Sequence, residues 1–585
     1  MSADFKRFSL ILALLLLFTV MAVNVAAQDE VAREDTVIFD IDDSAVPNPT
    51  NFNYLVPGVN RNQGAHQAMW EPLFVLNYET GEIQPWQGLS FTPNETQDVW
   101  TLKLREGIKW SDGVPFTADD VVFTLQTLLD DTTATLTNAA NMQQWVDSVK
   151  KIDDLTVEFD LKASNPRFQL DYFSVRIWGS LVILPKHVWE GQDPFTFTFY
   201  DAEKGWPIGT GPYKLNSANP TQFVWDRDDN WWGAAAGFHA LPEPKRLVWQ
   251  ITGSEENKAL LMSNHELDSA MNITLGAFEA IQARNPNAIG WYSELPYSWA
   301  DPCPRQLSFN TETAPWNDAN LRKAVSLIVD RNQIIEVAYE GTTTASKTMF
   351  VQYGGMETYI NAIVEAGMGV SPTSDVPAGQ ALIEAAGYTK NADGLYEKDG
   401  QVLTADFIVD NGTAEYTRTV NVVVEQLRNA GIDATAHPLT GATNGDNMAN
   451  GTFDASYNWD TCGSVNEPWV SMNTLNTHFY VPIGERASAN YIRWNTDGAK
   501  AYSAVVDQIG TLPLGDPQIV DLVVEAYKYI YDETPVIPLV QAAKLVPFDT
   551  TYWVGWPTAE DNYNHPATWW NSTHQIILNL KKAGS

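Results

Sequence analysis

The sequence WTLKLREGIKWSDGVPFTADDVVFTLQTLL, residues 100–129, predicts a strand, a turn and a helix in succession. Leu102 and Leu104 alternate with polar residues, which is the period of a half-buried strand. Ser-Asp-Gly at 111–113 is typical of a turn, because glycine accepts a positive φ and aspartate can bond to its own backbone. Thr117 and two acidic residues just after it predict a helix N-terminus, since a threonine hydroxyl caps free N–H groups and negative charge favours that end of the helix dipole.

The same stretch carries a family resemblance. Residues 104–125, LREGIKWSDGVPFTADDVVFTL, resemble the signature of the family-5 extracellular solute-binding proteins. Residues 305–335, RQLSFNTETAPWNDANLRKAVSLIVDRNQII, resemble the entry to that family's second large lobe, and GTGPY at 209–213 resembles its return turn. Such proteins are the receptors of ABC importers for peptides, nickel chelates and oligosaccharides. The resemblance therefore implies a binding protein that delivers a solute to a permease in the membrane.

The resemblance covers essentially the whole mature chain, and it implies an α/β, two-lobed clamshell of the periplasmic-binding-protein type with an extra subdomain. A chain of 585 residues is too long for a single hydrophobic core. We expect the chain to cross between the lobes near Ala300 and Leu539. The expected division is a signal peptide at 1–27, lobe I at 36–75, 205–299 and 540–585, the extra subdomain at 76–204, and lobe II at 300–539.

The first thirty residues, MSADFKRFSLILALLLLFTVMAVNVAAQDE, predict a secretory signal peptide. Lys6 and Arg7 precede an apolar stretch, and small residues at 25–27 offer a cleavage site. We expect export across the cytoplasmic membrane to a periplasmic or extracellular location; an uncleaved membrane anchor is the alternative. No cysteine lies near the expected cleavage site, so we do not expect a lipoprotein.

The charge of the chain limits its partners. Lys and Arg number 36 and Asp and Glu number 72, which gives a formal net charge of −36. Such a charge repels nucleic acids and anionic membrane surfaces, so neither is an expected partner. We expect a monomer in an extracytoplasmic space.

The sequence offers no catalytic or metal site. It lacks a G-x-S-x-G elbow and an H-E-x-x-H pair, and its eight histidines have no metal-ligand spacing. The 72 carboxylates ensure chance pairs, so they do not identify a glycosidase dyad. We therefore expect no enzyme, no cofactor and no metal. A metal-chelate receptor and a secreted glycoside-processing enzyme remain alternatives.

A first aromatic loop, YNWDTCGSVNEPW at 457–469, bears on the ligand. In the oligopeptide-binding branch of the family the matching segment reads W-C-x-D-Y-N-E-P, and its aspartate pairs with the terminal ammonium of the peptide. Alignment on Asn-Glu-Pro places the cysteine at Cys462 and replaces the aspartate by Ser464. This departure counts against a peptide ligand, although Asp460 lies nearby and could substitute.

A second aromatic loop, YWVGWPTAEDNY at 552–563, resembles the oligosaccharide-binding members, including cellobiose and xylo-oligosaccharide receptors. Sugar rings stack on aromatic planes, and their hydroxyls need acidic, amide or hydroxyl partners. Trp553 and Trp556 are therefore expected to stack on a sugar. The alternative is a tryptophan pair that covers the lobe interface.

These observations favour an oligosaccharide ligand, β-linked and similar to cellobiose or a xylo-oligosaccharide, with an oligopeptide as the alternative. The expected ligand-binding residues are Tyr54, Arg305, Trp459, Asp460, Ser464, Trp469, Trp553 and Trp556. The only cysteines, Cys303 and Cys462, are expected to form a disulfide, since cysteines of secreted chains usually pair. Two buried, unpaired thiols are the alternative.

Overall fold

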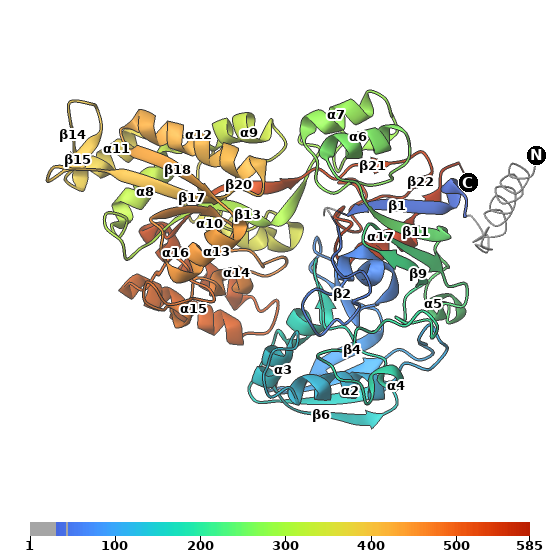
Figure 1. Ribbon diagram of the computed structural model, residues 1–585. Helices are drawn as coiled ribbons and strands as arrows, with labels where there is room; N and C mark the ends of the chain where they lie inside the picture. The colour runs from blue at the N-terminus through green and yellow to red at the C-terminus, as the bar shows by residue number, and fades with distance from the viewer. Residues whose placement is uncertain (1–30, 42–44, 585) are drawn as a thin grey trace, which may run out of the picture.

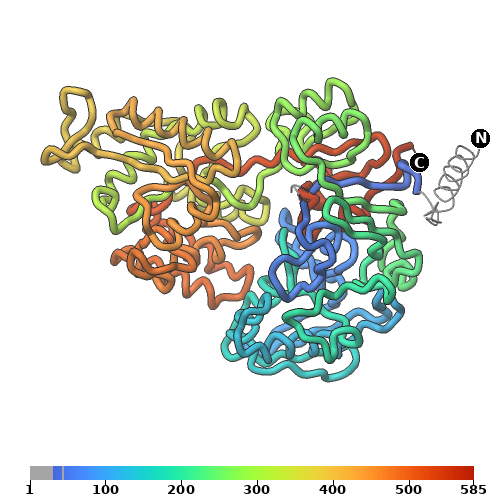
Figure 2. The backbone as a smooth tube through the Cα atoms, viewed as in Figure 1, coloured from blue at the N-terminus to red at the C-terminus, as the bar shows by residue number. Residues whose placement is uncertain are grey.

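The computed structural model describes residues 31–41 and 45–584. The expected signal peptide at 1–27 lies outside the described residues. Two bodies face each other across two long strands, with lobe I and the extra subdomain in one body and lobe II in the other (Figures 1 and 2). We keep these names for the residue ranges given above. No helix among the described residues is long and apolar enough to cross a membrane.

Lobe I contains a four-stranded sheet in the order β1-β11-β10-β9, in which β1 and β11 are parallel and the other neighbours antiparallel. Its buried face packs aromatic side chains, with Phe39 stacked on Trp249 at 4.7 Å between ring centroids. The strands are β1 (Thr36–Ile41), β9 (Tyr213–Asn219), β10 (Gln222–Arg227), β11 (Arg246–Ile251), β12 (Ala288–Ile289), β21 (Phe548–Asp549), β22 (Trp553–Val554) and β23 (Lys581–Lys582). The helices are η1 (Arg33–Asp35), η2 (Arg61–Met69), α5 (Trp232–Ala235), α6 (Glu255–Ser263), α7 (Leu275–Gln282) and α17 (Thr573–Asn579).

The extra subdomain contains an antiparallel sheet in the order β4-β5-β7-β6. The predicted strand, turn and helix are confirmed as β5 and α2, and Thr117 forms a capping box with Asp120, whose carboxylate accepts the Thr117 N–H at 2.9 Å. The strands are β3 (Ile83–Pro85), β4 (Gly88–Pro93), β5 (Val99–Leu104), β6 (Val146–Asp153), β7 (Thr156–Leu161) and β8 (Ser174–Val175). The strand β2 (Phe74–Leu76) spans the expected boundary with lobe I and pairs with β3 and β8. The helices are α2 (Ala118–Leu129), α3 (Ala139–Trp145), η3 (Gln169–Phe173) and α4 (Lys186–Trp189).

Lobe II contains a five-stranded sheet in the order β18-β17-β19-β13-β20, in which β17 is parallel to both of its neighbours. The strands are β13 (Trp299–Phe309), β14 (Thr389–Lys390), β15 (Tyr396–Lys398), β16 (Gln401–Val402), β17 (Thr404–Asp410), β18 (Asp433–Leu439), β19 (Ala455–Asn458) and β20 (Val536–Lys544). The helices are α8 (Ala319–Ile328), α9 (Arg331–Tyr339), η4 (Gly354–Met356), α10 (Glu357–Glu365), α11 (Val376–Ala385), α12 (Ala414–Ala430), α13 (Gly441–Asn450), α14 (Trp469–Asn473), η5 (Thr477–Phe479), α15 (Asp497–Thr511) and α16 (Gln518–Glu533).

The two long strands β13 and β20 join the bodies. They pair antiparallel from Ser308 opposite Val536 to Trp299 opposite Lys544. β20 thus continues through the boundary expected at Leu539, because it stays paired with β13 as far as Lys544. The strands carry the chain from lobe II towards α6 and α7 of lobe I (Figure 1). The region beside these two strands is therefore where lobe I and lobe II come together.

Candidate functional site

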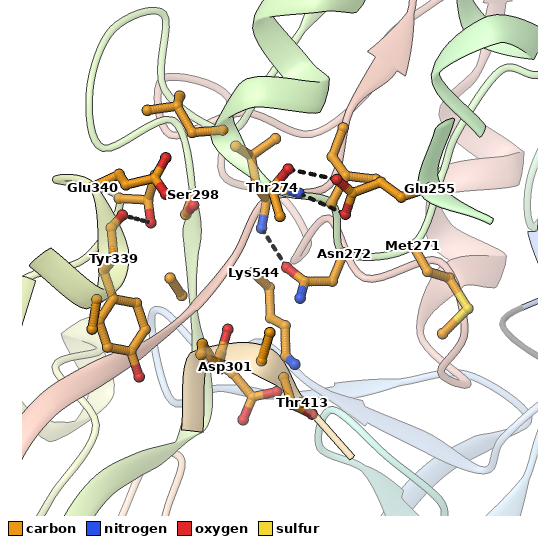
Figure 3. Close-up of a pocket in the computed structure, with 18 of the residues that line it drawn as sticks. Glu255, Met271, Asn272, Thr274, Ser298, Asp301, Tyr339, Glu340, Thr413 and Lys544 are labelled. Carbon is orange, nitrogen blue, oxygen red and sulfur yellow. Dashed lines mark hydrogen bonds between the residues drawn. The ribbon is translucent and has the colours of Figure 1, made fainter. Parts of the chain in front are cut away.

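A cavity of about 470 Å³ lies where β13 and β20 cross between the lobes. This volume is in the range of small-molecule sites. Lobe I, lobe II and the crossing strands all contribute to its lining, so it lies where closure of the lobes would enclose a ligand. Figure 3 shows Glu255 and Glu340 on opposite sides of this cavity, with Asp301 and Lys544 below them in the view.

The lobe I wall is held rigidly by its own hydrogen bonds. Thr274 is the N-cap of α7, and its hydroxyl and N–H both donate to the carboxylate of Glu255 at 2.5 and 3.2 Å. The side-chain carbonyl of Asn272 accepts the N–H of Leu545 at 3.0 Å. Figure 3 draws both sets of contacts. These bonds fix polar oxygen atoms along one side of the cavity.

The lobe II wall carries two ion pairs. Glu340 and Arg418 lie 3.0 Å apart at the cavity rim, where both side chains are exposed. Behind the wall, the buried guanidinium of Arg305 lies 3.6 Å from the carboxylate of Glu415 and donates to the hydroxyl of Tyr416 at 3.2 Å. Most of the wall's charge is thus paired within the protein.

The crossing strands supply the floor. Asp301 is buried, and its Oδ1 accepts the N–H of Cys303 at 3.0 Å. Lys544 is half-buried, and its ammonium makes no hydrogen bond or ion pair to any residue within 31–41 or 45–584. A carboxylate and an unpaired ammonium therefore border the same cavity.

Two adjacent tryptophans, Trp569 and Trp570, complete the lining. Both are half-buried, and their ring centroids lie 5.3 Å apart. Neither indole N–H donates to another residue of the described chain. Trp570 packs edge-on against Trp299 and Trp178, at 6.1 and 6.0 Å, which fixes its plane. This pair was not among the residues predicted from the sequence. The segment ATWWNST is not a specific signal, because the adjacent Trp231 and Trp232 also follow a polar segment and are buried.

Residues 82–480 match the sequence profile of the bacterial extracellular solute-binding proteins, family 5 middle region. The match spans more than half of the chain. The chain belongs to family 5 of the bacterial extracellular solute-binding proteins. It is thus a binding protein of an ABC importer with a permease as partner, and not an enzyme.

Individual relatives of this family 5 protein differ in ligand. The nickel-binding periplasmic protein of Escherichia coli is 27% identical over 406 residues, which are 66% of this chain and 69% of that protein. A periplasmic oligopeptide-binding protein from Thermotoga maritima has a similar fold, with a TM-score of 0.81, 22% identity and coverage of 94% of this chain and 100% of the other. A second structure of that protein, described as mannohexaose-bound, gives a TM-score of 0.74, 22% identity and coverage of 95% and 100%. The two-lobed α/β fold is therefore established, whereas the ligand class is not.

In this family 5 protein, Trp553 and Trp556 do not line the cavity, and their expected stacking role is wrong. Their exposed fractions are 0% and 3%. Their indole N–H groups donate to the carbonyls of Thr36 and Trp553, both at 2.9 Å. Trp556 also stacks on Phe548 at 4.5 Å. Both rings belong to the core of lobe I, so no face is left for a sugar.

Tyr54 and Ser464 are also occupied within the protein. The hydroxyl of Tyr54 donates to the carbonyl of Ser180 at 2.8 Å, and its ring packs against Trp70. Ser464 and Ser471 exchange two hydrogen bonds, in which each N–H donates to the other's hydroxyl oxygen at 3.0 Å. Both residues are buried, so the structure gives neither a contact with the cavity.

Arg305 and Trp459 lie behind the lobe II wall. The guanidinium of Arg305 lies beside the rings of both Tyr416 and Trp459, at 4.9 and 5.2 Å from their centroids. These two residues support the wall through Glu415 and do not border the cavity themselves. We therefore assign them a positioning role.

Asp460 borders a separate, smaller cavity of about 90 Å³ within lobe II, together with Gln306 and Asn490. Its Oδ2 is buried without a hydrogen-bond partner among the described residues. Burial raises the pKa of Asp460 from 3.8 to about 7. Trp469 lies elsewhere, under the guanidinium of Arg167 at 5.1 Å. Neither residue joins the cavity between the lobes.

Cys303 and Cys462 form a disulfide, with 4.4 Å between their Cα atoms. The bond joins β13 to the loop that contains Trp459 and Asp460, so it fixes this loop to a crossing strand. Among residues 31–41 and 45–584, no three His, Cys, Asp or Glu side chains cluster in a way that could hold a metal ion.

Proposed function

We propose that the inter-lobe cavity captures an oligosaccharide, β-linked and of the gluco-, xylo- or manno- type, for delivery to the permease. The observation that carries the proposal is the pair Trp569–Trp570, two half-buried aromatic side chains in the lining of the cavity. Sugars need such planes for their C–H faces. Asp301 and Lys544 border the same space and can accept from and donate to hydroxyl groups.

The loop at 457–469 supports a sugar over a peptide. Ser464 stands where the peptide-binding branch has its ammonium-binding aspartate, and it is buried in a reciprocal contact with Ser471. Asp460 borders a different cavity, and burial raises its pKa to about 7, so this carboxyl is poorly suited to hold a positive charge at neutral pH. The Thermotoga maritima protein fits this proposal. It is named as an oligopeptide-binding protein, yet its structure is described as bound to mannohexaose.

The mechanism follows from the position of the cavity between the lobes. A ligand that contacts both walls stabilises the closed form by the difference between its affinities for the closed and open forms. Oxygen atoms held by Thr274 and Leu545 on one side, and the paired charges on the other, need little rearrangement when a ligand arrives. The permease then receives a closed, loaded protein.

A thermal-shift screen tests the ligand class. Purified protein is mixed with β-linked gluco-, xylo- and manno-oligosaccharides in one series and with di- to pentapeptides in another. A ligand that binds only the native state raises its melting temperature. We expect a rise in a sugar series. A rise confined to the peptides would overturn the proposal.

Two variants, Trp569→Ala and Trp570→Ala, test the site. Loss of a tryptophan contact in a binding site typically weakens binding by about 2 kcal/mol, or roughly 30-fold. We expect such a loss in titrations followed by intrinsic fluorescence. Trp145→Ala is the matched control, because Trp145 is half-buried in the extra subdomain, outside the cavity lining. Equal affinities for all three variants and the unchanged protein would place the sugar elsewhere.

A further inference from the structure

Arg167 of the extra subdomain reaches into lobe II. Its Nη2 lies 3.2 Å from the carboxylate of Glu467. Its Nη1 donates to the carbonyls of Gly510 and Leu512 at 2.9 and 3.4 Å, at the C-terminal end of α15. The same guanidinium lies 5.1 Å from the centroid of the Trp469 ring. All of these partners are in lobe II, so one side chain links the two bodies.

This contact is separate from the crossing strands. In Figure 1, α15 and α14 of lobe II and α3 of the extra subdomain lie below the crossing of β13 and β20. Neighbouring contacts also span the two bodies, since the N–H of Gly354 donates to Glu79 at 3.3 Å and Tyr78 packs against Tyr353 at 4.8 Å. The bodies are thus joined covalently at one place and by side chains at another.

We propose that Arg167 is a latch that holds the closed form, and that the lobes open when it leaves Glu467 and the end of α15. Binding proteins of this kind open by rotation about the strands that connect their lobes. Such a rotation moves α14 and α15 away from the extra subdomain and breaks the contacts of the Arg167 guanidinium with lobe II. The latch does not depend on which solute binds in the cavity.

The chemistry of the contact suits a reversible latch. The side chains of Arg167 and Glu467 are only 2% and 5% exposed, so the charges attract each other in a medium of low dielectric constant. The carbonyls at the C-terminus of α15 carry the negative end of the helix dipole, which adds to the attraction. However, Arg167 Nε and Glu467 Oε1 have no partner among the described residues. Water satisfies both atoms once the lobes part, so opening regains hydration that the closed form lacks.

Removal of one partner should shift the equilibrium strongly. In Arg167→Ala, the carboxylate of Glu467 stays buried without its cation in the closed form but is hydrated in the open form. Because breaking a buried ion pair in this way is strongly unfavourable, we expect the ratio of open to closed protein to rise roughly 100-fold. Glu467→Gln removes the charge and keeps the shape, and should produce a smaller rise in the same direction.

Small-angle X-ray scattering of the ligand-free protein measures this shift as the radius of gyration. We expect Arg167→Ala to have a larger radius of gyration than the unchanged protein, and Glu467→Gln to show a smaller increase. Arg486→Ala is the matched control, because Arg486 pairs with Asp446 at 2.7 Å on the exposed surface of lobe II alone. It should scatter like the unchanged protein.

A thermal melt of each variant separates opening from misfolding. If Arg167→Ala does not fold, Glu467→Gln carries the test alone. A folded Arg167→Ala, or in its absence a folded Glu467→Gln, with the radius of gyration of the unchanged protein would overturn the latch. An equal expansion in Arg486→Ala would overturn it as well, because the effect would then not depend on the contact between the bodies.

Discussion

Asp460→Asn should stabilise the protein at neutral and alkaline pH. Asp460 has one carboxylate oxygen without a partner among the described residues, and burial raises its pKa to about 7 from an ordinary value of 3.8. In the unfolded chain this carboxyl ionises near pH 4. In the folded protein it resists ionisation up to about pH 7, so its contribution to stability falls as the pH rises from about 4 to about 7. An asparagine does not titrate, so the Asp460→Asn variant does not lose stability in this way as the pH rises.

The magnitude follows from the difference between the two pKa values. Each unit corresponds to 1.36 kcal/mol, so a shift of about three units sets an upper bound of about 4 kcal/mol above pH 7. Water that enters the cavity of about 90 Å³ beside Asp460 would hydrate the carboxylate and offset part of this energy. We therefore expect Asp460→Asn to gain about 2–4 kcal/mol at pH 8 and nearly nothing at pH 4.

Thermal or guanidinium unfolding at pH 4, 6 and 8 measures the effect. The advantage of Asp460→Asn should grow with pH, whereas Asp521→Asn, on the exposed surface of α16, should show no such trend. An advantage that is the same at all three pH values would refute the argument from burial. The same variant also tests the peptide alternative, since a response to peptides that disappears in Asp460→Asn would make this carboxyl an ammonium anchor.

Two further predictions concern stability. The disulfide between Cys303 and Cys462 closes a loop with a sequence separation of 159, and the chain-entropy model gives about 3–5 kcal/mol for such a loop. Reduction, or Cys303→Ser with Cys462→Ser, should lower the guanidinium midpoint accordingly, and an unchanged midpoint would contradict the model. Trp553→Phe should lower the free energy of unfolding by about 2–4 kcal/mol, because it removes the hydrogen bond from the indole N–H to the Thr36 carbonyl and leaves a small cavity. It should leave sugar affinity unchanged, and a weakened affinity would return Trp553 to the binding site.

Local signals in the sequence predicted local structure well. The alternation of Leu102 and Leu104 and the cap at Thr117 depend on neighbours a few residues away, and both features are present as β5 and α2. The family and its two-lobed fold were predictable from long ordered motifs. The extent of β20 was not, because it depends on pairing with β13, more than 200 residues earlier in the chain.

The ligand site was harder to predict for a physical reason. Trp553 and Trp556 lie in a polar sequence, yet their N–H groups find backbone carbonyls inside lobe I, one of them at Thr36, far away in the chain. A polar neighbourhood in sequence therefore did not mean an exposed ring. Trp569 and Trp570 are half-buried in the cavity lining, whereas the adjacent pair Trp231 and Trp232 is buried at 2% exposure for each ring. Adjacency in the sequence therefore does not tell a cavity pair from a core pair, because the difference depends on which other elements pack against the rings.

The charges of the cavity argue for a neutral ligand. Of its acidic residues, Glu340 pairs with Arg418, and Glu415 lies beside Arg305. Glu255 accepts two hydrogen bonds from Thr274, but these donors are neutral and leave its charge in place. The carboxylates of Glu255 and Asp301 and the ammonium of Lys544 therefore remain at the cavity. An anion would gain from the one ammonium but face two carboxylates. Hydroxyl groups both donate and accept, so a ring of hydroxyls can bond to groups of both signs without bringing a further charge.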